Sequence, residues 1–171
     1  MAWLRWLGFG GSEQNSVAAD TETVRKIVAR LDALDPQRAR YIAAFAYILG
    51  RVANADRHID AGEIRAMEEL VVKHGALPEE QAVLVVQIAR AQNTLTGGTE
   101  NFLVTREFAS IATPEQKFAL LDAAFAVSAA EAGVSAVEEN EIARIADELL
   151  MSHTDYIAVR SRWRDELNVL R

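Results

Sequence analysis

Residues 54–63, NADRHIDAGE, bring three carboxylates and an imidazole into one short stretch. The acids are Asp56, Asp60 and Glu63, and the imidazole belongs to His58. Carboxylate oxygens are the donors that hard divalent cations take in proteins, and a histidine nitrogen would shift the preference towards a transition metal. The stretch is therefore a candidate metal site. Asp60 and Glu63 also have the spacing of a capping box, in which side chains satisfy free N–H groups at a helix start.

A second stretch repeats this pattern 75 positions later, which is the spacing from Asp56 to Glu131. The matched pairs are Asp56 with Glu131, Ile59 with Val134, Asp60 with Ser135, and Glu63 with Glu138. The apolar positions that follow each stretch also correspond and have the spacing of one helix face. We interpret the chain as two copies of a helix, an acidic turn and a second helix. Two copies predict a pseudo-twofold bundle, because a solenoid needs about three or more repeats to bury a core.

Helix capping explains only some of the acidic residues, and those it does not explain are candidate cation ligands. Capping explains Asp60, Glu63, Ser135 and Glu138, but Asp56 and Glu131 should end the preceding helices, where the helix dipole disfavours negative charge. If the two turns approach one another, Asp56, Glu63, Glu131 and Glu138 could bind a hard cation, with Asp60 and His58 as auxiliary ligands. The alternative is that the turns contain only caps and solvated acids.

The rest of the chain predicts helix nearly throughout. Three prolines and nine glycines are the main breaks, and strong helix formers dominate between them. Asp35-Pro36 and Thr113-Pro114 have the pattern of helix starts, Gly75 that of a helix end, and Gly97-Gly98 that of a break. We expect an all-α, single-domain bundle of about eight helices with an internal pseudo-twofold repeat.

The N-terminus has a different character from the predicted domain. Residues 1–9, MAWLRWLGF, form a short apolar segment, residues 10–20 form a polar, glycine-rich linker, and the helical domain is expected to span residues 21–171. Trp3, Leu4, Trp6 and Leu7 are the candidate contact residues of the first segment. They could pack on the domain or a protein partner, or they could touch a membrane surface.

Composition excludes several functions. The chain has 18 Lys and Arg against 25 Asp and Glu, a net charge of −7, which argues against nucleic-acid binding. The basic run at residues 160–164, RSRWR, fits a solvated helix end better than a nucleic-acid patch. No cysteine is present, so thiolate metal sites and a cysteine nucleophile are excluded.

Without a signal sequence or membrane span, we expect a cytoplasmic protein, with peripheral contact at the inner face of the membrane as an alternative.

The paired motifs ADRHIDAGE and AAEAGVSAVEENE resemble those of the TerB-like family, named for tellurite-resistance proteins. The resemblance covers about residues 36–155, and the departures from the family pattern are Arg57-His58 and Ala132-Gly133, which occupy its variable positions. It implies an all-helical fold, an association with tellurite or general stress responses, and metal binding through the acidic residues. It carries no known reaction with it.

We therefore expect a TerB-like module that acts by binding a divalent cation, Ca, Mg, Mn or Zn, and is not an enzyme. The rival hypothesis is a metal-free helical scaffold that holds a protein partner, forms a homo-oligomer or touches a membrane through its N-terminal segment. Acid/base catalysis by the paired carboxylates ranks last, because no substrate-binding signature accompanies them.

Overall fold

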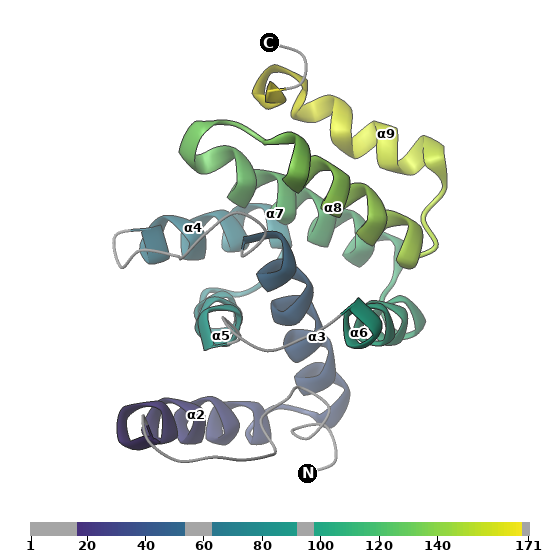
Figure 1. Cartoon of the computed structure of the whole chain (residues 1–171). Coiled ribbons are helices and arrows are strands. Elements are labelled where there is room, and N and C mark those ends of the chain that lie inside the picture. Colours follow the sequence, from purple (N-terminus) through teal and green to yellow (C-terminus); the bar gives the residue numbers. More distant parts are fainter. Residues whose placement is uncertain (1–16, 54–62, 92–97, 169–171) are drawn as a thin grey trace.

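The computed structural model describes residues 17–53, 63–91 and 98–168, and Figure 1 shows their arrangement. Within these ranges the chain forms α-helices and one short 3-10 helix, η1, with no strand, so the predicted all-α fold is confirmed. The helices are α2 Val17–Asp32, α3 Pro36–Ala53, α4 Glu63–Gly75, α5 Glu79–Ala91, α6 Gly98–Ile111, α7 Pro114–Ala132, α8 Ala136–Glu148, α9 His153–Arg162 and η1 Arg164–Glu166.

Helix α3 is the centre of the bundle. Residues 41–50 of this helix are all buried, and α3 packs against α5, α6, α7 and α8. Five alanines in its sequence, PQRARYIAAFAYILGRVA, leave room for neighbours to approach, while Tyr41 and Phe45 fill the space between them. The ring of Phe108 from α6 stacks on Tyr41 with centroids 5.1 Å apart. The core therefore combines small residues on α3 with aromatic contacts to α6.

Further helix contacts fix the positions of α4 and of the C-terminal helices. Helix α4 packs along α7 and α5, and α8 and α9 both pack on α7, with α9 on the outer side of the bundle. Gly75 ends α4 against the core, where an added Cβ would lie 3.0 Å from the Phe45 ring. A larger residue at this position would force that ring to move.

Local signals in the sequence set several helix boundaries as predicted. Pro36 begins α3, Gly75 ends α4, and α5 follows Pro78. Thr113 caps α7: its hydroxyl accepts the Gln116 N–H, and the Gln116 side chain accepts the Thr113 N–H. These caps supply acceptors for N–H groups that have no partner within the helix.

The expectations for the N-terminal region, the internal repeat and membrane spans have separate outcomes. Helix α2 begins at Val17, so the last residues of the predicted linker are helical, and the expected domain start at Thr21 lies inside α2. Residues 1–9, with Trp3, Leu4, Trp6 and Leu7, lie outside the described residues. The pseudo-twofold repeat stays an interpretation of the sequence. Within the described ranges, no helix has the length and apolar character needed to cross a membrane.

Candidate functional site

The second acidic turn connects α7 to α8 and contains a complete capping box. The Ser135 hydroxyl accepts the Glu138 N–H at 3.3 Å, and the Glu138 carboxylate accepts the Ser135 N–H at 2.8 Å. The capping role predicted for Ser135 and Glu138 is therefore confirmed. An ionised carboxylate offers about four lone-pair positions, so capping leaves the half-buried Glu138 able to accept further bonds.

The end of the chain holds this turn in place through residues 164–168, here called the C-terminal strap. The Val134 N–H donates to the Glu166 carbonyl at 2.7 Å, and the Asn168 N–H donates to the Val134 carbonyl at 3.0 Å. Leu167 and Val134 are both fully buried. Gly133 has φ of 82°, and a Cβ at this position would lie 2.6 Å from the Glu166 carbonyl oxygen. The turn and the strap therefore form one unit that depends on glycine at residue 133.

The remaining predicted ligands are only partly described. Glu63 is the first residue of α4, and Glu131 lies in the last turn of α7. Asp56, His58 and Asp60 lie outside the described residues. Among the side chains that the structure does describe, no group of three or more histidines and acids is arranged to hold a metal ion. The four-carboxylate site is thus neither assembled nor contradicted by the described part of the chain.

The orientation of α4 on α7 bears directly on that site. His74, near the end of α4, contacts Asp122 in the middle of α7, and the two helices pack along their length. At 1.5 Å per residue, Glu63 lies about 16 Å along α4 from His74, and Glu131 lies about 14 Å along α7 from Asp122. The helices are antiparallel, and the start of α4 and the end of α7 lie at the same end of the pair (Figure 1).

A second polar cluster surrounds Asp122 and joins three helices. The His74 Nδ1 lies 2.8 Å from one carboxylate oxygen, and the Trp163 indole N–H donates to the other at 2.9 Å. Because a carboxylate only accepts, Nδ1 of His74 carries the proton in this contact. The Arg162 guanidinium approaches the same carboxylate at 3.8 Å. Asp122 thereby ties the end of α4 and the end of α9 to α7.

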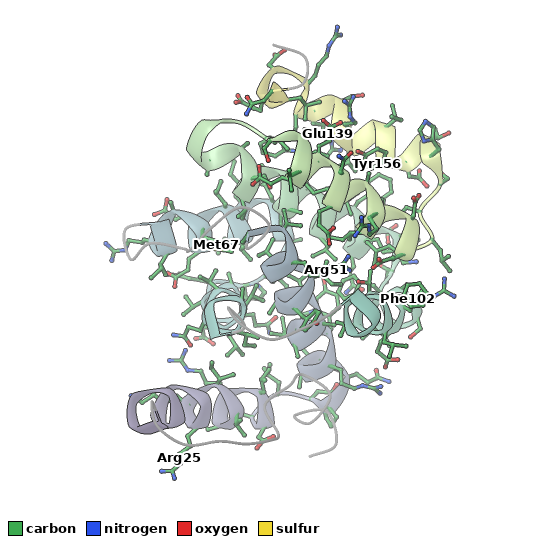
Figure 2. The ribbon with its side chains drawn as sticks, in the orientation of Figure 1. Arg25, Arg51, Met67, Phe102, Glu139 and Tyr156 are labelled. Carbon is green, nitrogen blue, oxygen red and sulfur yellow. The ribbon has the colours of Figure 1, made fainter. Side chains whose placement is uncertain are left out.

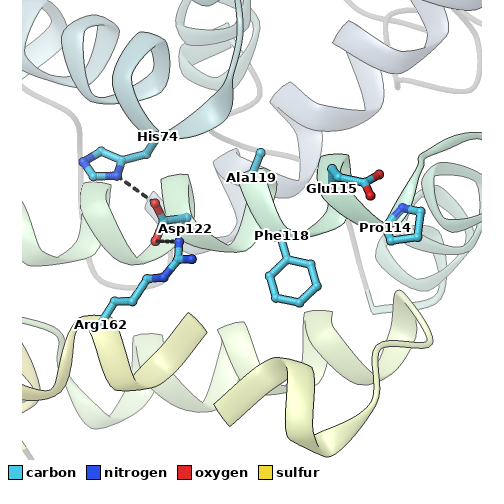
Figure 3. A pocket seen from close by; sticks show the side chains of 7 residues that line it. All are labelled: His74, Pro114, Glu115, Phe118, Ala119, Asp122 and Arg162. Carbon is cyan, nitrogen blue, oxygen red and sulfur yellow. Dashed lines mark hydrogen bonds and ion pairs between the residues drawn. The ribbon is translucent and has the colours of Figure 1, made fainter. Parts of the chain in front are cut away.

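His74, Asp122 and Arg162 form one end of a cavity of about 370 Å³ beside α7. Its lining, drawn in Figure 3, comprises His74 of α4, Pro114, Glu115, Phe118, Ala119 and Asp122 of α7, and Arg162 of α9. Figure 3 shows the Phe118 ring between α7 and the C-terminal helix, with Glu115 and Asp122 on opposite sides of it. The cavity is therefore polar at its two ends and apolar between them.

The sequence interpretation did not identify this cluster. It treated residues 160–164 as a solvated helix end, whereas Trp163 packs on the core and bonds to Asp122. Arg160 also pairs with the half-buried Glu139 of α8. The available signal was Asp122 itself, a single acid in the apolar run FALLDAAFA, since such an acid needs partners when its helix packs.

Comparisons with known proteins agree with the resemblance in the acidic motifs. No curated protein and no solved structure gave a significant match to the chain. A family model described as "Tellurite resistance protein TerB" matches residues 41–161, a range that begins in α3 and ends in α9. This range covers well over half of the chain and includes both acidic turns. The protein therefore belongs to the TerB family and carries a module of the tellurite-resistance type.

Proposed function

We propose that this TerB module acts by binding a divalent cation between its two acidic turns, within a stress response, rather than by catalysis. The ligands would be Asp56, Glu63, Glu131 and Glu138, with His58 and Asp60 as auxiliary donors. The observation that carries the proposal is the antiparallel packing of α4 on α7. This packing brings the start of α4 and the end of α7 to one end of the helix pair.

The chemistry of the donors favours a hard cation. Four carboxylates without cysteine form an oxygen donor set, which suits Ca²⁺, Mg²⁺ or Mn²⁺, while a histidine nitrogen would also admit Zn²⁺. The cation would neutralise charges that otherwise repel one another. By bridging the two turns, it would stabilise one packing of α4 against α7 and signal its presence through that packing.

Titration of chelator-treated protein with each of the four ions tests the proposal. Calorimetry should show saturable binding of at least one ion, and the same ion should raise the melting temperature. The double variant Asp56→Asn/Glu131→Gln should lose both effects. Absence of heat and of any thermal shift for all four ions would overturn the proposal.

A matched control separates site binding from a general charge effect. Glu69→Gln/Glu80→Gln removes the same number of charges from two exposed positions on α4 and α5. This variant should bind the ion as the unmodified protein does. If both double variants weaken binding equally, the cation responds only to net charge.

A second candidate function is a homodimeric scaffold, and the outer surface of α6 favours it. Phe102, labelled in Figure 2, and Leu103 are 46% and 53% exposed. The Arg106 guanidinium lies over the Phe102 ring. Such exposed apolar side chains can form a self-complementary patch around a twofold axis. Sedimentation velocity should then show a concentration-dependent dimer that Leu103→Asp abolishes. A protein that stays monomeric at every concentration would rule out this interface.

A further inference from the structure

The cavity beside α7 is separate from the proposed cation site and has the size of a small-molecule site. Its volume of about 370 Å³ falls in the usual range of ligand pockets, which is roughly 300–1,000 Å³. Helices α4, α7 and α9 each contribute to its lining. The acidic turns, in contrast, lie beyond Ala132 and before Glu63. The chemistry of this cavity therefore needs its own explanation.

The Asp122 end of the cavity places an exposed guanidinium, that of Arg162, beside a carboxylate. Asp122 is engaged by short contacts to His74 and Trp163, whereas its 3.8 Å separation from Arg162 is too long for a hydrogen bond. The Arg162 side chain is 65% exposed. Since a guanidinium has five N–H donors in a planar fork, Arg162 can receive an anion while Asp122 holds it in position. In Figure 3 its guanidinium extends from α9 towards the side of α7 that carries Asp122 and Phe118.

The middle of the cavity is apolar and its far end is acidic, and both restrict which ligand groups can bind there. Phe118 and Ala119 offer apolar surface about one helical turn from Asp122. Glu115 occupies the far end, about 10 Å from Asp122 along the helix axis at 1.5 Å per residue. Its negative charge disfavours a second anionic group there and favours a hydrogen-bond donor or an ammonium group.

We propose that this cavity binds an amphipathic organic carboxylate. The carboxylate pairs with Arg162 at the Asp122 end, the apolar body lies on Phe118 and Ala119, and a donor or amino group at the other end of the ligand faces Glu115. A ligand of this class matches both the order and the spacing of the chemical groups along α7. The proposal is independent of cation binding at the acidic turns.

Phenylacetate and its neutral isostere phenylacetamide provide the first test, by NMR titration of the unmodified protein. Phenylacetate should bind saturably at a dissociation constant of about 1 mM, as expected for so small a ligand, and should shift the Trp163 indole N–H resonance. That resonance is identified by its loss in Trp163→Phe. Phenylacetamide should bind at least about tenfold more weakly, because it cannot form the charged hydrogen bonds to Arg162. Equal affinity for the two, or no saturable shift, would overturn the proposal.

Variants then locate the ligand in the cavity. Arg162→Gln should weaken phenylacetate about tenfold. Arg144→Gln should leave its affinity unchanged, since Arg144 is equally exposed at 68% and also lies near an acid, but on α8. A probe with an added aminomethyl group at the para position should bind more tightly than phenylacetate, and Glu115→Gln should remove that gain. If Arg144→Gln and Arg162→Gln have the same effect, the anion is attracted by overall charge and the cavity is not the site.

Discussion

Among single residues, Arg51 shows most clearly how charge is accommodated in this core. Its side chain is 5% exposed, and it contacts Glu141 at 2.7 Å, Glu148 at 2.6 Å and the Thr105 hydroxyl at 2.7 Å. Burial alone would lower the pKa of Arg51, but the hydrogen bonds and charges of Glu148 and Glu141 raise it overall. The guanidinium therefore stays charged and links α3 to α6 and α8. Figure 2 shows Arg51 near the centre of the molecule.

Arg51→Met should destabilise the protein by about 3–5 kcal/mol, because two half-buried carboxylates would lose their cation. Chemical denaturation measures this loss as a lower transition midpoint. Arg144→Met is the control, since Arg144 is 68% exposed and pairs with the same Glu141 at 3.4 Å. A surface pair of this kind is worth at most about 1 kcal/mol. Equal losses of stability in the two variants would show that the burial of the Arg51 ion pairs adds nothing to the free energy of unfolding.

Tyr41 should make stability depend on pH in the alkaline range. Burial raises the pKa of Tyr41 to about 12, against a smaller opposing effect of Arg38. The folded protein therefore keeps the phenolic proton when the unfolded chain has already released it. This contribution is complete below the ordinary pKa of about 10 and is lost as the pH rises through the folded value of about 12.

Ultraviolet titration of tyrosinate absorbance, together with melting temperatures between these pH values, checks the Tyr41 prediction. Tyr41→Phe keeps the ring that stacks on Phe108 and removes the ionisable group. In this variant, the alkaline decline in stability should be shallower and the latest tyrosine ionisation should disappear. An unchanged titration curve would contradict the assignment.

At the scale of elements, the turn between α7 and α8 and the C-terminal strap depend on one glycine. Gly133→Ala should destabilise the protein by at least about 2 kcal/mol, because a side chain is strained at φ of 82° and its Cβ would meet the strap. The clash involves the Glu166 carbonyl at 2.6 Å and the Asn168 side-chain oxygen at 2.7 Å. Thermal or chemical denaturation measures the loss.

Adding Asn168→Ala separates the two sources of that strain. This second change removes the contact with the Asn168 side-chain oxygen but leaves the Glu166 carbonyl in place. The double variant should therefore recover part of the stability lost by Gly133→Ala. Additive losses would mean that the Asn168 side chain does not contribute to the clash.

The same elements show what sequence can and cannot predict. Thr113-Pro114 and Ser135 through Glu138 were recognisable because capping joins residues only three positions apart. The bonds from Asp122 to His74 and Trp163 join residues 48 and 41 positions apart, so they depend on how α4, α7 and α9 pack. The all-α class and several boundaries were thus predictable, whereas the cavity and the C-terminal strap were not.

At the scale of the whole molecule, the proposed cation site depends on negative charge collecting at one end of the α4 and α7 pair. The chain carries a net charge of −7, and the start of α4 and the end of α7 add acids to the same region. In the proposed site, acids without a cation would repel one another and oppose folding. A cation bound at the proposed site would stabilise the folded state, and the gain would grow with the logarithm of ion concentration above the dissociation constant.

We therefore predict that Glu131→Gln raises the melting temperature without the cation and lowers it when the cation is present. In chelator, the substitution should raise the melting temperature, because it removes one of the repelling charges, and added salt should shrink the gain by screening. At an ion concentration about 100 times the dissociation constant, binding supplies about 2.7 kcal/mol to the unmodified protein. The variant binds the ion more weakly, so it should melt several degrees lower, at about 2–4 °C per kcal/mol for a domain of this size.

Glu69→Gln, on the exposed face of α4, should shift the melting temperature equally in both conditions. If Glu131→Gln behaves like Glu69→Gln, the acidic turn between α7 and α8 contributes charge and a helix cap but no ligand to a cation.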